Sequence, residues 1–400
     1  MNFLKKTVDR LEPTFSEGGK LSKLHSVFDG FKTFMFVPNT TSKSGVNIHD
    51  AIDSKRLMIT VVIALIPALL FGMWNVGYQH FLAIGCEEAT FWNQFWFGFL
   101  AVLPKLLVSY IVGLGIEFTS AQIKKEEIQE GFLVSGILIP MIVPVDTPLW
   151  MLGLATAFAV IFAKEVFGGT GYNIFNVALV TRAFLFFAYP TSMSGDQVWV
   201  RSNGVFGWAA GEKLDIVSGA TPLGQLATSA ESTAAYHDIL GNAIGFKEAF
   251  LGMIPGSIGE TSTLAILIGA ALLIITGVAS WKTMLSVFVG GALTAFAFNQ
   301  WGPDTAIAHL PWYEHLVLGG FAFGAVFMAT DPVTSARTEC GKWIYGFLIG
   351  LMAVVVRVLN PGYPEGMMLA ILLMNIFGCL IDYFVVQRNI KRRMKRISTK

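Results

Sequence analysis

The stretch DIVSGATPLG (215–224) sets a threonine, Thr221, between small residues and a proline. The serine, glycine and alanine before it leave their backbone N–H groups accessible, and successive N–H groups can form an anion-binding nest. Pro222 favours an extended conformation at Thr221, which would project the hydroxyl outward. These features predict a hydroxyl that receives and holds a phosphate group. The alternative is an ordinary Gly-Pro turn; a nucleotide P-loop is excluded because no GK[ST] follows.

Three carboxylates stand in or beside apolar segments, where a charged side chain costs roughly 2.5 kcal/mol or more at the bilayer centre. They are Glu117, Asp331 and Asp382. A carboxylate together with carbonyls of unwound backbone suits a hard cation, so these residues are candidates for a Na+ path. The alternatives are carboxylates just outside the hydrocarbon, or ion pairs with Arg182 or Arg357.

A glycine-rich run, KEVFGGTGYN (164–173), follows an apolar segment and contains Gly169 and Gly171. Glycines permit close backbone approach, and Asn173 and Asn176 offer amide donors and acceptors at membrane depth. These residues are candidates for a cofactor region. The alternative is that the glycines pack helices and the asparagines cap the next helix.

The composition indicates a membrane protein. Of 400 residues, 54% are hydrophobic and 14% are charged, and the mean hydropathy is +0.60, whereas soluble domains carry about a quarter charged residues. A net charge of +1 excludes a broadly basic nucleic-acid binder. The three cysteines are far apart and no histidines are paired, so we expect no iron–sulfur cluster, zinc site or haem in this chain. No nucleophile stands with a base, so no catalytic residue is expected.

Ten apolar windows approach the roughly 20 residues that cross the hydrocarbon core. They cover residues 57–77, 95–117, 131–145, 148–167, 174–190, 262–280, 283–299, 314–330, 343–359 and 366–386. The third and eighth are interrupted by prolines, as in transporters whose sites are built from broken helices.

The two halves of the chain are weakly similar. The recurring elements are Gly136…Pro144 with Gly324…Pro332, and Gly171-Tyr172 with Gly362-Tyr363. Five windows per half would make the repeats inverted. We therefore expect an all-α polytopic membrane protein with about ten transmembrane helices in two inverted five-helix repeats.

Lysine and arginine are distributed unevenly about these windows. The outer loops hold only Arg201, Lys213 and Lys247, so the positive-inside rule places both termini in the cytoplasm. The expected organisation is a cytoplasmic extension (1–55), a first membrane repeat (56–190), an outer-face loop region with Thr221 (191–260), a second membrane repeat (261–386) and a basic cytoplasmic tail (387–400).

The chain contains Asp215-x-x-Ser218-Gly219-Ala220-Thr221, which resembles the flavin-attachment motif D-x-x-[ST]-G-A-[ST]. Together with the ten windows, this motif resembles the NqrB/RnfD family, the membrane subunits of the Na+-translocating NADH:quinone oxidoreductase (Nqr) and of its Rnf counterpart. The resemblance extends through most of the chain. It includes EIQEGFLVSGILIP (127–140), FAKEVFGGTGYNIFNVALVTRAFLFFAYP (162–190) and FGAVFMATDPVTSA (323–336).

This resemblance implies FMN on Thr221 through a covalent phosphoester, and a non-covalent riboflavin near the cytoplasmic face. The riboflavin candidates are Gly169, Gly171, Asn173 and Asn176. A quinone pocket would be lined by Gly113, Gly115 and Glu117; the alternative for the two glycines is plain helix packing. Apart from the resemblance, Phe34, Phe36 and Trp74 are candidates for holding the quinone head, and the alternative for them is anchoring at the membrane interface. Asp382 and Glu117 would affect cation uptake.

Three segments depart from the family pattern. The chain has Asn176-Val177-Ala178-Leu179 where N-P-A-L is frequent, an insertion at 200–214, and G-L-G (113–115) where adjacent glycines are usual. We expect these departures to alter the local geometry without affecting the resemblance.

The resemblance implies a redox subunit of the bacterial inner membrane that reduces ubiquinone or menaquinone while Na+ moves outward. Its expected partners are the other subunits of a six-subunit complex and a flavin transferase. NADH oxidation would occur elsewhere, since no GxGxxG follows a strand. The alternatives are the Rnf-type subunit, which the long N-terminal extension disfavours, and a flavin-free channel or permease, which leaves the SGAT motif unexplained.

Overall fold

The computed structural model of the chain describes residues 2–15, 28, 32–33, 36, 45, 54–86, 88–124, 131–194, 198–201, 203–209, 211, 218–229 and 235–398. Asp215 and Phe34 lie outside these residues. Helices dominate the described part, where no β-strand forms beyond two isolated bridges. The predicted all-α class is confirmed.

Within the described residues, six helices are long and apolar enough to cross a membrane. They are α3 (Ser54–Ala83), α4 (Phe91–Lys124), α6 (Leu149–Ala159) with its extension to Phe167, α11 (Trp281–Trp301), α15 (Glu339–Leu359) and α16 (Met367–Ser398). Three shorter apolar helices lie among them: α5 (Phe132–Met141), α7 (Val177–Ala188) and α10 (Thr263–Ile275). The chain is therefore a multi-pass membrane protein, while the count of ten spans in two repeats stays a prediction.

The two proline-interrupted windows are broken, as predicted. The third forms only α5, which stops at Met141 before Pro144. The eighth divides into α13 (Glu314–Val317), α14 (Phe321–Phe323) and a π-helical turn, η5 (Gly324–Met328).

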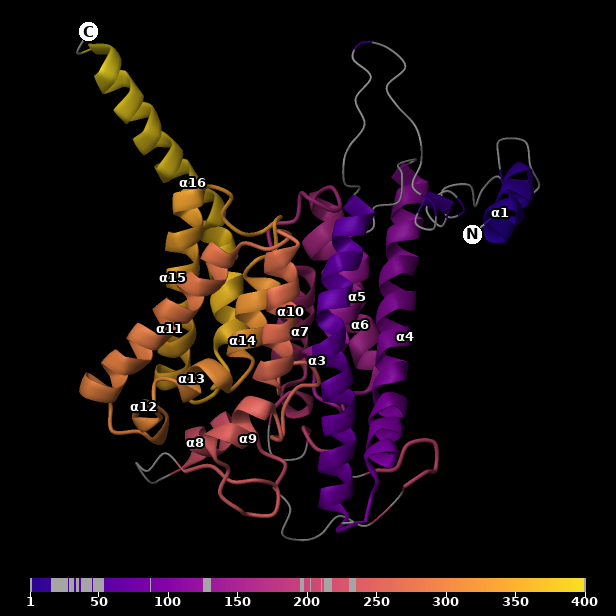
Figure 1. Cartoon of the computed structure of the whole chain (residues 1–400), viewed down its shortest axis with the longest axis vertical. Coiled ribbons are helices and arrows are strands. Elements are labelled where there is room, and N and C mark those ends of the chain that lie inside the picture. Colours follow the sequence, from indigo (N-terminus) through magenta and orange to yellow (C-terminus); the bar gives the residue numbers. More distant parts are fainter. Residues whose placement is uncertain are drawn as a thin grey trace.

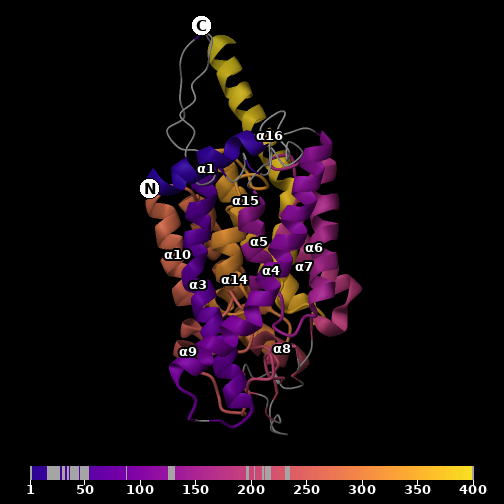
Figure 2. The same cartoon turned by 90° about the vertical axis from the view of Figure 1, so that its right-hand side faces the viewer.

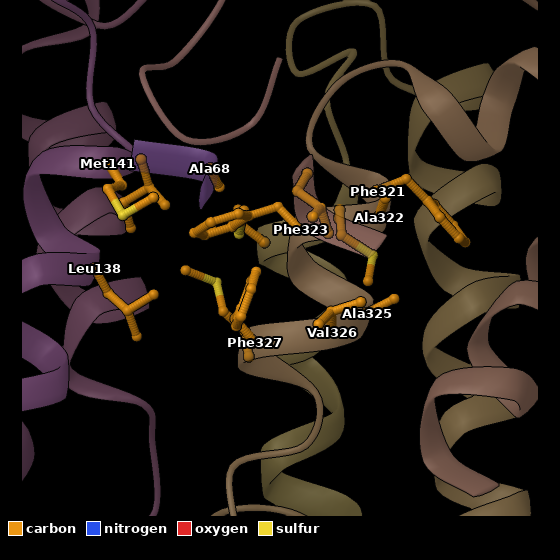
Figure 3. Packing of buried hydrophobic residues seen from close by; sticks show 14 of the residues in the cluster. Ala68, Leu138, Met141, Phe321, Ala322, Phe323, Ala325, Val326 and Phe327 are labelled. Carbon is orange, nitrogen blue, oxygen red and sulfur yellow. The ribbon is translucent and has the colours of Figure 1, made fainter. Parts of the chain in front are cut away.

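The broken segments meet in the centre of the hydrophobic core. Leu138 and Met141 of the first half lie opposite Phe323 and Phe327 of the second half (Figure 3). The carbonyl oxygen of Met141, left free where α5 stops, accepts a 2.8 Å hydrogen bond from the N–H of Gly259.

Glycines let the long helices approach closely. A Cβ atom on Gly350 of α15 would lie 2.1 Å from the carbonyl oxygen of Val287 in α11, and one on Gly98 of α4 would lie 1.6 Å from that of Met73 in α3. Such contacts require a residue without a side chain.

The bundle has two distinct ends. The N- and C-termini lie at one end, where α1 (Asn2–Phe15) is also found, and α8 (Pro222–Thr228) and α9 (Phe246–Leu251) lie at the other (Figures 1 and 2). The segment that begins α8 is thus separated from both termini by the length of the bundle. We call the end with the termini the inner end and the end with α8 the outer end.

Candidate functional site

Thr221 immediately precedes α8 at the outer end. Its backbone is extended, with φ −65° and ψ 154°, as the following proline predicts. Its side-chain oxygen accepts a 3.1 Å hydrogen bond from the N–H of Gly224 and so caps the helix. The predicted outward projection is wrong: this cap turns the side chain back onto α8, and Thr221 is only 8% exposed.

Gln225 fixes the segment around Thr221. Its amide donates to the carbonyl oxygens of Ala220 (3.1 Å) and His237 (2.9 Å), and accepts from the N–H of His237 at 2.9 Å. Next to His237, the Tyr236 hydroxyl donates to a Glu314 carboxylate oxygen at 3.1 Å. Burial raises the pKa of Tyr236, and the charge on Glu314 raises it further. The attachment candidate therefore sits in a braced loop.

A cavity of about 230 Å³ adjoins Thr221. Three aromatic side chains line it, Phe186, Trp199 and Tyr363, and the rings of Phe186 and Tyr363 pack edge to face with centroids 4.6 Å apart. Arg182 adds a guanidinium. Such a lining suits a planar aromatic ligand that carries polar or anionic groups.

Arg182 is held in place by buried charges. Its guanidinium pairs with Glu260 at 2.6 Å and with Glu365. Nearby, the fully buried Arg357 donates to the backbone carbonyl oxygens of Glu365 and His315, at 2.9 and 2.5 Å. Two arginines thus balance two glutamates. Arg182 lines the cavity together with its partner Glu365 and has little freedom to move.

A second cavity, of about 220 Å³, lies at the inner end and includes Met58 near the start of α3. Asn173 and Asn176 line it together with Asp331, so the structure unites two riboflavin candidates with one Na+ candidate. Gly169 and Gly171 form the adjacent turn at φ 93° and 94°, in the left-handed region that favours glycine.

Asn176 has two roles at the inner cavity. Its side-chain oxygen accepts from the N–H groups of Ala178 (3.0 Å) and Leu179 (3.3 Å), which caps α7. Its amide nitrogen donates to a carboxylate oxygen of Asp331 at 3.1 Å. The capping alternative is therefore confirmed for Asn176, although the same residue also faces the cavity. Asn173 bonds locally, donating to the carbonyl oxygen of Phe175 at 3.0 Å.

Two features of the inner cavity favour a bound polar group. The π-helical turns η2 (Val160–Lys164) and η5 each contribute to its lining, through Lys164 and Phe327, and such turns are frequent at functional sites. The Thr170 hydroxyl oxygen is buried with no hydrogen-bond partner among the described residues. A polar ligand in the cavity would supply one.

The quinone candidates do not share one face of α4. Glu117 pairs with Lys164 and both are buried, so its ion pair is with neither Arg182 nor Arg357. A Cβ on Gly113 would lie 1.9 Å from the Phe132 ring, whereas one on Gly115 would meet nothing within 4 Å.

Among the aromatic quinone candidates, Trp74 lies apart from Glu117. Trp74 stacks on Phe91 at the opposite end of α4, with ring centroids 6.1 Å apart. Phe36 is half-buried in the N-terminal segment.

Asp382 anchors the start of α15 from α16. Its carboxylate accepts from the N–H of Arg337 (2.6 Å), and from the N–H (3.0 Å) and hydroxyl (2.6 Å) of Thr338. In the part of the chain that the structure describes, no three His, Cys, Asp or Glu side chains cluster as a metal site. Asp382, Asp331 and Glu117 therefore do not form one shared metal site.

Comparison with known proteins decides the family. The model of the NQR2, RnfD, RnfE family matches residues 41–391. The chain belongs to this family. Three similar relatives are all named as the same subunit of Na(+)-translocating NADH-quinone reductase. The protein of Chromohalobacter salexigens is 46% identical, covering 98% of this chain and 96% of its own length. Those of Klebsiella pneumoniae (strain 342) and Haemophilus influenzae (strain PittEE) are 45% and 43% identical, each covering 98% of this chain and 99% of its own length.

Sequence reasoning missed three charged residues in this family member. Glu260 and Glu365 lie just outside the apolar windows and were not considered with the intramembrane carboxylates. Lys105 lies inside the second window, and its buried ammonium donates to the carbonyl oxygens of Pro144 (3.3 Å) and Thr147 (2.8 Å). A charge inside the membrane is costly for lysine as well as for carboxylates, so its position in an apolar window could have identified Lys105 from the sequence.

Proposed function

We propose that this chain is the membrane redox subunit of a Na+-translocating NADH:quinone oxidoreductase, with FMN joined to Thr221 by a phosphoester. Family membership and the names of the relatives support the role in this complex. The observation that carries the site is the cavity beside Thr221, lined by aromatic rings and Arg182. Flavin bound there supplies electron transfer, and the protein supplies orientation and electrostatics.

The residues around Thr221 fit such a group. The threonine hydroxyl accepts from Gly224, and among the described residues no acceptor takes its own proton. A Cβ on Gly224 would lie 3.1 Å from the hydroxyl oxygen and crowd it. The SGAT motif and this glycine therefore leave the oxygen available for a phosphate. Arg182 and Glu365 line the cavity as an ion pair, so they give its wall polar groups without a net positive charge.

The inner cavity is proposed to hold riboflavin. Asn173 and Asn176 offer amides, Thr170 offers an unpartnered hydroxyl, and Lys164 borders the same space. The residues that flank Gly171-Tyr172 line this cavity, while Gly362 and Tyr363 line the outer one. Placement of the two related turns at opposite ends supports ten spans in two inverted repeats.

In this proposal the subunit passes electrons to ubiquinone or menaquinone and couples this to Na+ export. The candidates stay as predicted: Gly113, Gly115 and Glu117 for the quinone, and Glu117, Asp331 and Asp382 for Na+. The other Nqr subunits and a flavin transferase would be its partners. It would lie in the bacterial inner membrane with both termini in the cytoplasm.

The test is in-gel flavin fluorescence of the denatured chain, co-expressed with a flavin transferase. Denaturation removes non-covalent flavin, so a fluorescent band reports a covalent bond. We expect fluorescence in the wild type and its loss in Thr221→Ala. Thr228→Ala is the matched control, because Thr228 lines the same cavity and its variant should stay fluorescent. A dark wild-type band would instead support a flavin-free channel, and a fluorescent Thr221→Ala band would place the flavin elsewhere.

A further inference from the structure

The last helix continues well beyond the length needed to cross a membrane. α16 starts at Met367 and runs unbroken to Ser398, which is 32 residues. A span needs about 20 of them, so about 12 residues continue past the hydrocarbon, roughly 18 Å at 1.5 Å per residue. Figure 1 shows this end of α16 leaning out beyond the rest of the bundle.

The projecting end is strongly basic. Residues 387–400 contain no aspartate or glutamate and carry seven basic residues: Arg388, Lys391, Arg392, Arg393, Lys395, Arg396 and Lys400. The six that fall within α16 are all exposed. No carboxylate lies within this segment, so any protein or lipid countercharge for these cations comes from outside it.

A narrow apolar stripe runs between these cations. Val386, Ile390, Met394 and Ile397 are 44%, 45%, 65% and 75% exposed. At 100° per residue, the four side chains fall within an arc of about 80°. An exposed apolar stripe on a helix that leaves the membrane marks a surface that contacts a protein or the membrane.

The spacing of the stripe disfavours a partner helix. A coiled-coil seam alternates steps of three and four residues, so a seam through Val386, Ile390 and Ile397 would need an apolar residue at 393. Arg393 occupies that position. A thin apolar stripe flanked by cations is instead typical of helices that lie in a membrane interface, where long basic side chains extend to the headgroups.

We propose that residues 386–398 bind the anionic phospholipid headgroups of the membrane that α16 spans. The first five residues past Val386 rise about 7.5 Å at 1.5 Å per residue, within one Debye length of roughly 8 Å at physiological salt, so Arg388 and Lys391 reach the surface potential directly. The long basic side chains further along the helix extend back toward the headgroups. The basic segment would thus fix α16 on the leaflet that it leaves.

Hydrogen–deuterium exchange of the full chain in nanodiscs tests this proposal. One set of discs is phosphatidylcholine alone, and the other contains phosphatidylglycerol as well. We expect the amides of residues 388–398 to exchange at least about fivefold more slowly in the anionic discs. This protection should disappear in about 1 M NaCl, where the Debye length is about 3 Å. Amides of α15 serve as the internal reference.

Two variants separate charge from helix propensity. The variant R392Q/R393Q/K395Q/R396Q should lose the protection, and R392K/R393K/K395R/R396R, which keeps every charge, should retain it. Equal exchange in both kinds of disc would overturn the proposal. It would also be overturned if protection followed the addition of other subunits regardless of lipid, because the cover would then be a protein.

Discussion

Thr221 and Arg182 face the same cavity, one from the start of α8 and the other from the middle of α7. Arg182 belongs to the buried charge network, since Glu260 and Glu365 both contact its guanidinium. The network thus joins α7 to the segments before α10 and before α16. The same residue that lines the cavity also connects the segments that form its walls.

Replacement of Arg182 by methionine should destabilise the chain strongly. The change leaves the buried Glu260 and Glu365 without their shared cation, and breaking a buried pair from one side costs about 3–5 kcal/mol. We expect a marked fall in the Tm of the detergent-solubilised protein. Unfolding is monitored by the fluorescence of a thiol-reactive dye. Arg182→Lys keeps the charge, but its single ammonium group replaces the branched guanidinium that contacts both glutamates. The Tm of this variant should therefore lie between those of the wild type and Arg182→Met.

Lys282→Met is the matched control for the Arg182 variant. Lys282 also pairs with a glutamate, Glu339, but in an exposed position. Solvent screens such a pair, so its loss should leave Tm almost unchanged. Equal Tm values for Arg182→Met and the wild type would show that the two glutamates find other partners.

The sequence predicted the elements of this site better than their contacts. Hydropathy and prolines identified the long helices and both broken segments, because each property is local. Pro222 correctly predicted the extended backbone at Thr221 for the same reason. The N-cap bond that buries the threonine was missed, since it depends on where α8 begins.

Pairing of the buried charges could not be predicted, because it depends on helix packing. One alternative was an ion pair between an intramembrane carboxylate and Arg182, but the partners of Arg182 are Glu260 and Glu365, which come from loops. The same alternative for Glu117 named an arginine, yet Glu117 meets Lys164 of the next long helix. Without contacts between distant segments, residue type and spacing leave several partners equally possible.

Gly113 and Gly115 should respond differently to the same substitution. In Gly113→Ala the new Cβ would lie 1.9 Å from the buried Phe132 ring, so either this ring must shift or α4 and α5 must separate. Overpacking of this kind costs about 1–3 kcal/mol. Gly115→Ala places its Cβ in open space and should be neutral or slightly stabilising, since alanine favours the helix. Tm of the two variants is the measurement.

A double variant shows whether the Gly113 effect is steric. Phe132→Leu removes the ring that the new Cβ would strike, so Gly113→Ala should cost much less in that background than alone. Additive losses would contradict the packing explanation and favour a direct role of Gly113 in ligand binding. Quinone reductase activity, measured on the same variants in the assembled complex, tells whether activity follows Tm.

Asn176 combines a helix cap with an amide that faces the inner cavity, and two variants can separate these roles. Asn176→Ala removes the cap, at about 1 kcal/mol, together with the 3.1 Å hydrogen bond to Asp331. We expect a lower Tm and a loss of flavin released on denaturation, measured by chromatography. The covalent flavin signal that we propose for Thr221 should be unchanged, because that residue lies at the other end of the bundle.

Asn176→Ser supplies the comparison that decides the role of the amide. Serine caps a helix about as well as asparagine, so α7 should keep its stability, but its short side chain carries no amide to reach Asp331. If the amide holds the ligand, Asn176→Ser should have nearly wild-type Tm and yet release as little flavin as Asn176→Ala. Wild-type flavin in the serine variant would reduce Asn176 to a cap and leave Asn173, Thr170 and Lys164 to hold the ligand.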